Sequence, residues 1–215
     1  MNDDNDVVDE HLVMRASINS KAAGSSYVEH GKSKTICSVF GPHEISRDVP
    51  FSLRAKLDCK VTLSPMCKKF NSDDDFAMQN AELSQHLFTC CYSAILLHKY
   101  PKTQIDIRVL VISNLSSTIF SDVVVAAGIA LCDAGIEMYD VLTADTIVNE
   151  DKMFLSLAFL PNVSQVCGLR LRTINGKNIA LDDLKCLELI NECKLKCQQQ
   201  ATLVRRSLLQ SYTTD

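Results

Sequence analysis

The stretch GSSYVEHGKSKTICSVFGPH, residues 24–43, determines how the rest of the chain is interpreted. Polar and apolar residues alternate on both sides of the tight connection His30-Gly31-Lys32, a pattern typical of a β-hairpin. Gly41-Pro42 is expected to break the second strand. That strand carries several β-branched or aromatic residues, which favour a sheet: Ile36, Val39 and Phe40. We therefore expect the domain to open with an antiparallel hairpin.

Further strands and helices are expected on both sides of a central apolar segment. The helix predicted over residues 121–134 is apolar on nearly all faces, so it should be buried, with Ser121 or Asp122 as its cap and Gly135 at its end. Apolar periodicity predicts two more helices, over residues 77–99 and 182–210. Strands are predicted over residues 57–63, 105–112, 141–148, 154–160 and 163–171, and Asn175-Gly176 is a good hairpin turn.

These elements predict an α+β domain with seven or eight strands and three helices. A chain of 215 residues is long enough to bury one substantial core. We expect a flexible tail over residues 1–14 and one domain over residues 15–212.

Composition excludes some classes of function. The net charge of −4 gives no global basic field that would attract nucleic acid. The acidic N-terminus does not resemble a signal peptide, and the longest apolar region, residues 123–138, is interrupted by Asp133 and Glu137. We expect a soluble, intracellular protein with no membrane partner.

The ten cysteines raise the possibility of a metal site, but their spacing does not favour one. No C-x-x-C occurs. Cys193 and Cys197 lie one helical turn apart and could bind zinc together, yet no histidine is near them in sequence. Buried, reduced cysteines are the favoured interpretation, and we expect no metal and no cofactor.

Acid–base chemistry also has weak support. His43 precedes Glu44 and superficially suggests a catalytic pair, but no nucleophile stands beside them, so a surface histidine is favoured. Asp133 and Asp140 could form a carboxylate pair. Their expected role is to cap the buried helix and the turn that follows it.

Basic residues are the better candidates for binding. The candidate RNA-binding residues surround the strand at 57–63 and the loop after it: Arg54, Lys56, Lys68 and Lys69. A solvated charged face is the alternative. Arg170 and Arg172 alternate on a predicted strand and could contact RNA or a neighbouring subunit, whereas Arg205 and Arg206 are expected to be solvated.

These motifs resemble one family. Residues 24–43 are similar to the opening of ribonuclease PH-like domains, whose pattern is G-S-A-x-x-E-x-G-x-T-K-V-x-x-x-V-x-G-P-R. Residues 57–70 resemble the strand and loop that carry RNA-facing basic residues, and YPKTQ at 100–104 resembles the turn after the first long helix. DAGIEMYD at 133–140 and LPNVSQVCG at 160–168 resemble the branch that builds the hexameric ring of the eukaryotic RNA exosome.

The resemblance makes two compositional gaps informative. Residues 109–151 contain no Lys, Arg or His, and residues 152–181 contain no Asp or Glu. In active members a phosphate-binding arginine falls near the position of Phe120, and a catalytic aspartate, a probable magnesium ligand, lies on the strands after Val148. Phosphorolysis needs a fixed cationic clamp and a proton donor, so the resemblance implies that this chain has no catalytic residues.

The leading expectation is therefore a non-catalytic, structural and RNA-channel subunit of the exosome ring, supporting RNA processing and degradation in the nucleus, nucleolus and cytoplasm. The resemblance implies other RNase PH-like subunits, cap proteins and RNA as partners, with apolar edge strands as the pairing surface. Two alternatives remain open: an active phosphate-dependent 3'–5' exoribonuclease, and an RNA-binding adaptor outside any ring.

Overall fold

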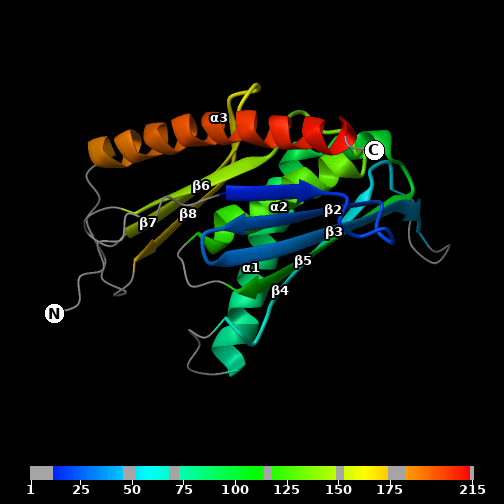
Figure 1. Ribbon diagram of the computed structural model, residues 1–215, viewed down its shortest axis with the longest axis horizontal. Helices are drawn as coiled ribbons and strands as arrows, with labels where there is room; N and C mark the ends of the chain where they lie inside the picture. Colours follow the sequence, from blue (N-terminus) through cyan, green and yellow to red (C-terminus); the bar gives the residue numbers. More distant parts are fainter. Residues whose placement is uncertain are drawn as a thin grey trace.

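The computed structural model describes residues 12–45, 52–67, 73–113, 118–148, 153–173 and 183–213. This part of the chain forms eight strands, three α-helices and a short 3-10 helix (Figure 1). In chain order they are β1 Leu12–Ala16, β2 Gly24–His30, β3 Ser33–Glu44, β4 Lys56–Leu63, α1 Asp73–Ala94, η1 Leu97–Lys99, β5 Thr103–Ser113, α2 Ile119–Asp133, β6 Thr143–Val148, β7 Met153–Leu160, β8 Gln165–Thr173 and α3 Asp183–Thr213. The α+β prediction is confirmed.

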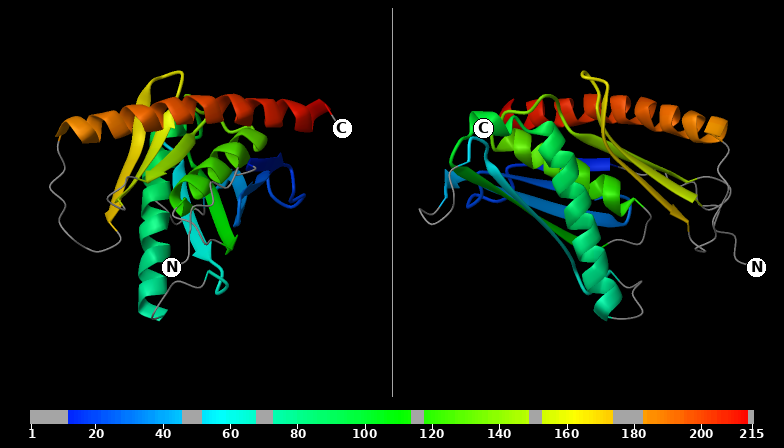
Figure 2. Two further views of the ribbon diagram at one scale, coloured as in Figure 1. Left: turned by 60° about the vertical axis from the view of Figure 1, so that its left-hand side comes forward. Right: turned by 180° about the vertical axis from the view of Figure 1, so that it is seen from behind.

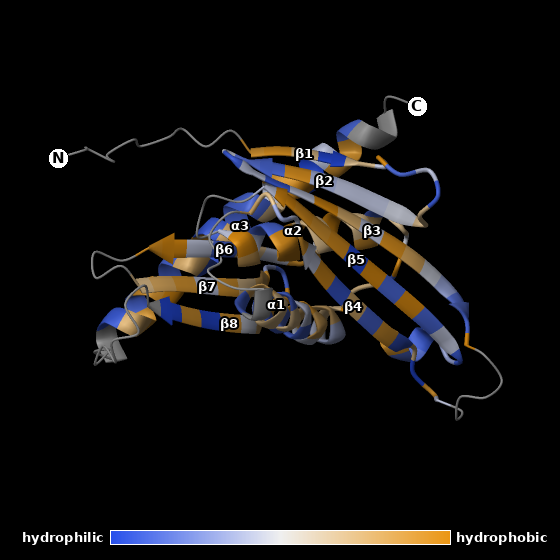
Figure 3. Ribbon diagram, turned by 90° about the horizontal axis from the view of Figure 1, so that it is seen from below, coloured by the Kyte–Doolittle hydropathy of each residue, from blue (hydrophilic) through white to orange (hydrophobic). Residues whose placement is uncertain are grey.

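The strands form two separate sheets. The larger sheet has the order β1-β2-β3-β5-β4 and is antiparallel except where β4 and β5 run parallel. The smaller sheet has the order β6-β7-β8 and is antiparallel throughout. Hydrophobic and hydrophilic residues alternate along β4 and β5, so only one face of the larger sheet is apolar (Figure 3).

The predicted hairpin is confirmed as β2 and β3, joined at Gly31, whose φ of 59° suits glycine. The predicted break at Gly41-Pro42 is wrong. Strand β3 continues to Glu44, because the irregular register between Phe40 and His43 absorbs this dipeptide and pairing with β5 then resumes.

Helix α2 lies between the two sheets and forms the centre of the core. Every residue from Ile119 to Leu131 is buried, which confirms the prediction from its apolar sequence. Close packing explains its glycine: a Cβ at Gly128 would lie 2.3 Å from the carbonyl oxygen of Leu142. Gly24 of β2 makes a similar close contact, because it packs against the backbone of Ala130 and Ala134 at the C-terminal end of α2.

Helix α1 lies beside α2 on the apolar side of the larger sheet, whereas α3 covers the outer side of the smaller sheet (Figure 3). Helix α1 packs on β4 and also contacts β8 and α2. Helix α3 runs along one side of the molecule over β6 and β7 and reaches β1 (Figures 1 and 2). A second small core forms under α3 from Ile147, Leu155, Leu157, Phe159, Cys193 and Cys197.

Several predicted boundaries shift. Helix α1 ends at Ala94 rather than at residue 99, because Leu96 donates to the carbonyl of Glu137 and Ala55 donates to that of Leu97. Strand β1 begins at Leu12, so residues 12–14 pair with β2. The Asn175-Gly176 turn and residues 1–11 of the expected tail lie outside the described residues.

Candidate functional site

The start of α2 is the place where the resemblance puts a phosphate-binding arginine. Phe120 stands there, and it is only 2% exposed. Its ring lies edge-on to His86 of α1, with centroids 5.9 Å apart, and a Cβ at Gly168 of β8 would lie 3.7 Å from its tip. The side chain thus fills the space between α1 and β8 with hydrocarbon.

A chain of buried hydroxyl groups leads from the smaller sheet to the first turn of α2. Thr146 of β6 donates to Ser121 at 3.2 Å, and Ser121 donates to the carbonyl of Thr118 at 2.7 Å. Since Thr146 uses its proton there, Ser156 of β7 is the donor in their 2.8 Å contact. The three hydroxyl groups therefore satisfy one another and use their protons within the protein.

Arg170 of β8 brings a cation close to this chain, since it lies opposite Ser156 in the sheet. Its side chain is 5% exposed, and Nε and Nη2 both donate to Oε1 of Glu82, at 3.1 and 2.7 Å. The expectation that Arg170 contacts RNA or a neighbour is wrong, because the guanidinium is buried against a carboxylate of α1. Arg172 is exposed.

Two acidic residues lie near the same end of α2. Asp122, with a side chain that is 4% exposed, contacts Nδ1 of His30 at 3.1 Å and accepts from Thr118 at 3.1 Å. The predicted cap is therefore wrong: Thr118 occupies the cap position, and Asp122 links α2 to β2. Burial raises the pKa of Asp145, while a hydrogen bond from the backbone of Thr146 and the charges of Lys196 and His30 partly oppose that shift.

The sequence did not single out Asp145, His30, Glu82 or His86. Strand alternation could have placed Asp145 on the same side of β6 as Thr143 and Ile147. No spacing rule connects His30 to Asp122, or Glu82 to Arg170, because tertiary packing brings these residues together from different elements.

The cysteines lie mostly in the core. Cys193 and Cys197 are fully buried, and their thiols contact the carbonyl oxygens of Leu155 and Leu157 on β7. Burial raises the pKa of each to about 12. Across the described ranges, no three His, Cys, Asp or Glu residues are arranged to hold a metal ion.

The candidate RNA-binding residues fall around β4. Arg54 and Lys56 are exposed, and Nη1 of Arg54 donates to the hydroxyl of Tyr92 on α1 at 3.1 Å. Lys68 and Lys69 lie outside the described residues. The structure therefore brings Arg54 together with α1.

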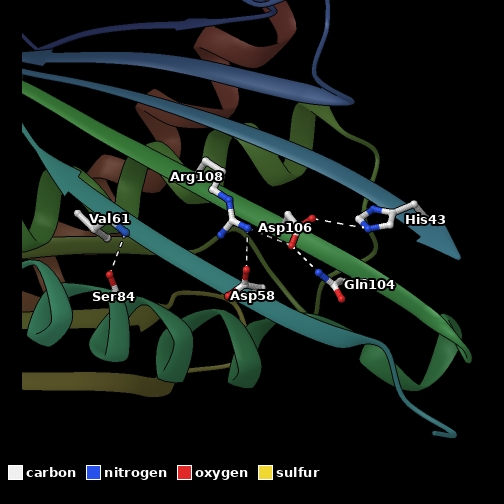
Figure 4. A network of polar contacts seen from close by, with 7 residues as sticks. All are labelled: His43, Asp58, Val61, Ser84, Gln104, Asp106 and Arg108. Carbon is white, nitrogen blue, oxygen red and sulfur yellow. Dashed lines mark hydrogen bonds and ion pairs between the residues drawn. The ribbon is translucent and has the colours of Figure 1, made fainter. Parts of the chain in front are cut away.

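The outer face of the larger sheet carries a polar network of its own (Figure 4). Arg108 donates to Asp58 at 2.6 Å and lies 3.5 Å from Asp106. His43 contacts the same Asp106 at 3.6 Å, and its side chain is half-exposed. This network fits the interpretation of His43 as a surface residue, although its partner is Asp106 rather than Glu44.

Asp133 and Asp140 act as structural anchors in different places. Asp133 accepts from the backbone and hydroxyl of Ser17 and from the backbone of Ser25, so it holds the connection between β1 and β2 rather than capping α2. Asp140 accepts from Asn162 and from Arg205. Arg205 is exposed, as expected, and α3 also brings its guanidinium to Asp140.

The two sheets packed around a buried helix define an RNase PH-like fold. The sequence model of the 3' exoribonuclease family, domain 1, matches residues 11–137. The chain therefore belongs to the ribonuclease PH family of 3' exoribonucleases.

Similar proteins are components of exosome complexes. An RRP41-like exosome component of Arabidopsis thaliana is 34% identical over 128 residues, which cover 60% of this chain and 48% of the relative. The human exosome component MTR3 is 27% identical over 185 residues, covering 72% of this chain and 68% of the relative. The match thus spans about half the length of the Arabidopsis protein and two thirds of the human one.

Solved structures support the fold. Rice Rrp46 superimposes with a TM-score of 0.75 at 19% identity, covering 93% of this chain and 95% of that one. A chain of an Archaeoglobus fulgidus exosome with RNA bound to its active site gives a TM-score of 0.70 at 15% identity, with coverage of 89% and 87%. None of the helices in the described ranges combines the length and the apolar character that crossing a membrane requires.

Proposed function

We propose that this chain is a non-catalytic, structural and RNA-channel subunit of an RNA exosome ring, of the MTR3 type. In this role it supports 3'–5' RNA processing and degradation, including rRNA maturation and RNA turnover, in the nucleus, nucleolus and cytoplasm. Its similarity to exosome components supports the assembly. The observation that carries the absence of catalysis is the buried Phe120 at the start of α2.

The position of the phosphate-binding arginine and strand β7 both hold side chains that do not fit the chemistry of phosphorolysis. Phosphorolysis requires a cation that holds the phosphate and an acid that protonates the leaving group. Phe120 supplies neither, and Arg170 is neutralised by Glu82. On β7 the hydroxyl of Ser156 is committed to Thr146. Magnesium prefers carboxylate oxygens, and β7 carries none.

A phosphorolysis assay tests this part of the proposal. The purified chain, incubated with single-stranded RNA, Mg²⁺ and inorganic phosphate, should release no nucleoside diphosphates. Phosphate-dependent release that falls in an Arg170→Gln variant would instead establish the alternative, an active 3'–5' exoribonuclease. The Arg172→Gln variant is the matched control, because Arg172 is an exposed arginine on the same strand.

The free edge of the smaller sheet supports a subunit contact. Strand β8 is its last strand, and it exposes apolar side chains: Val166 at 42%, Leu169 at 44% and Leu171 at 41%. An apolar edge strand of nine residues without an acidic residue is a liability in an isolated protein and a ready surface for pairing. We place the contact with another RNase PH-like subunit at this edge.

Co-expression with other exosome ring subunits and cap proteins tests the assembly. We expect a stable complex, and Leu169→Asp with Leu171→Asp should abolish it, while Leu195→Asp with Leu203→Asp on the exposed side of α3 should not. A monodisperse monomer with no affinity for any ring subunit would refute the proposal.

We also assign the candidate RNA-binding residues to the RNA-channel role of the subunit. Arg54, Lys56, Lys68 and Lys69 would contact phosphates of RNA near the ring, and no cofactor is needed. Reversing their charges should weaken RNA binding while the ring still assembles. An adaptor that works outside the ring would instead bind RNA alone and show no subunit partner.

A further inference from the structure

The C-terminal half of α1 carries an exposed aromatic pair. The rings of Phe88 and Tyr92 stack with centroids 5.7 Å apart and an interplanar angle of 29°. Tyr92 is 45% exposed, and Phe88 is partly exposed one turn before it. Two exposed, uncharged polar residues of α1, Gln85 and Thr89, lie close to these rings in the sequence. We call these four residues the α1 stripe.

Arg54 borders this stripe in a fixed position. The segment before β4 is held against η1, which follows α1, by the hydrogen bond from Ala55 to the carbonyl of Leu97, at 2.9 Å. Ser52 and Arg54 are joined by two further hydrogen bonds. The guanidinium donates to the hydroxyl of Tyr92, which places a planar cation at the edge of an exposed ring.

The charges around the stripe select an anionic, aromatic ligand. Residues 83–94 contain no Asp, Glu, Lys or Arg, although the whole chain has a net charge of −4. Arg54 therefore gives this region a positive charge, in contrast to the net negative charge of the whole chain. Exposed aromatic faces beside a cation are the means by which proteins hold unpaired bases and their phosphates.

We propose that the α1 stripe and Arg54 form a stacking site for an unpaired base of single-stranded RNA, with Arg54 on the adjacent phosphate. This inference rests on the proposed function, which supplies RNA as the ligand class. It adds Tyr92 and Phe88 to the binding residues, and it gives Arg54 a planar, hydrogen-bonded role that lysine could not fill.

Fluorescence anisotropy with a labelled 12-nucleotide oligouridylate tests the proposal. Tyr92→Leu should weaken binding roughly 5- to 100-fold, the range that follows from the loss of one stacked base. Tyr92→Phe keeps the ring and should retain most of the affinity. Arg54→Gln should lower affinity and reduce the slope of log Kd against log salt by about one.

Matched controls separate stacking from general charge. Tyr139 is 57% exposed at another place, so Tyr139→Leu should leave the affinity unchanged, as should Arg206→Gln. An abasic strand of the same length should bind the wild-type chain as weakly as the RNA binds Tyr92→Leu. Equal binding of the abasic strand, or an unchanged affinity of Tyr92→Leu, would overturn the proposal.

Co-purification with ring subunits is the second test of the proposal. Tyr92→Leu should co-purify with ring subunits as the wild type does. Loss of a subunit in this variant would make the stripe a protein contact and the RNA site wrong. Failure of the wild-type chain to join any ring would refute the proposed function instead, so the two failures are distinguishable.

Discussion

Single carboxylates hold distant parts of this chain together. Asp140, with a side chain that is only 3% exposed, collects the backbone and side-chain amides of Asn162 and the guanidinium of Arg205. It therefore joins the loop after α2, the turn between β7 and β8, and α3. Asp140 contributes to the stability of the fold by accepting these hydrogen bonds. When the carboxylate is removed, each of the donors loses its acceptor.

Asp140→Ala should destabilise the fold by about 2–4 kcal/mol, since charged hydrogen bonds and a partly buried ion pair are lost together. Urea unfolding monitored by circular dichroism measures the change. Glu188→Ala, at an exposed position on α3, serves as the control and should change the stability very little. A loss no larger than that of the control would contradict the role of Asp140 as an anchor.

Asp145 gives the opposite case, a carboxylate that burial disfavours. One of its oxygens has no hydrogen-bond partner among the described residues, and burial raises its pKa above the ordinary value of 3.8. The folded state therefore holds the proton more tightly than the unfolded chain. It follows that the ionised carboxylate lowers stability above its folded pKa, and that this penalty disappears as the pH falls below about 4.

Asp145→Asn should consequently be more stable than the wild type at pH 7, and the difference should shrink as the pH is lowered toward 4.5. Thermal unfolding across this range measures it, with Glu188→Gln as a control whose effect stays flat. A variant that is less stable at every pH would show that the hydrogen bond from the backbone of Thr146 and the attraction to Lys196 together outweigh burial.

At the scale of elements, α2 depends on backbone contacts that leave no space for larger side chains. Ser26 of β2 donates to the carbonyl of Ala126 at 2.6 Å, and Gly128 faces the carbonyl of Leu142. The helix is thereby held against the larger sheet on one side and against the start of β6 on the other. This packing fixes where Phe120 lies.

Gly128→Ala should destabilise the protein by roughly 2–3 kcal/mol, because backbone atoms must move to admit the new methyl group. This loss exceeds the gain of about 1 kcal/mol that alanine brings to an exposed helix. Gln199→Ala on α3 is the control, and urea unfolding is the measurement. Equal or higher stability of Gly128→Ala would show that α2 can shift freely.

The periodicity of hydrophobic residues predicted the elements well where the pattern is regular over the whole segment. The alternation in β4 and β5 and the apolar run of α2 needed only local rules, and the hairpin needed only its glycine turn. The failures have one cause. Asp122 was expected to be a cap, Arg170 to contact RNA or a neighbouring subunit, and Arg205 to be solvated, yet each pairs with a residue from another element. The sequence carries no local signal for Glu82 and His86, because Glu82 meets Arg170 and His86 meets Phe120 only after α1 packs.

At the scale of the whole molecule, one continuous core spans both sheets. It contains residues of β3, β5 and β7 together with α1 and α2. The cysteines are part of this interior, and burial raises the pKa of Cys90 to about 12 and of Cys167 to about 11. Neutral thiols in a packed core are poor nucleophiles.

Alkylation of the native protein with iodoacetamide at pH 8 should therefore modify Cys59 and Cys186 first, because these two are partly exposed. Cys132 is also partly exposed, but burial raises its pKa to about 11, so it should react more slowly. Cys90, Cys193 and Cys197 should react only after unfolding. Peptide mass spectrometry over time gives the order, and urea-unfolded protein provides the reference rate. Labelling of the three buried thiols as fast as Cys59 would show that the core opens readily.

The hydroxyl chain from Ser156 to the carbonyl of Thr118 has an evolutionary consequence. Each group donates to the next, so a carboxylate introduced at Ser156 would have to be accommodated by Thr146 and Ser121, whose protons already have acceptors. Phe120 would have to change as well, and its space is shared with His86 and Gly168. Under the proposed function, a return to catalysis would therefore need changes at more than one of these buried positions, because each of them is packed against or hydrogen-bonded to the others.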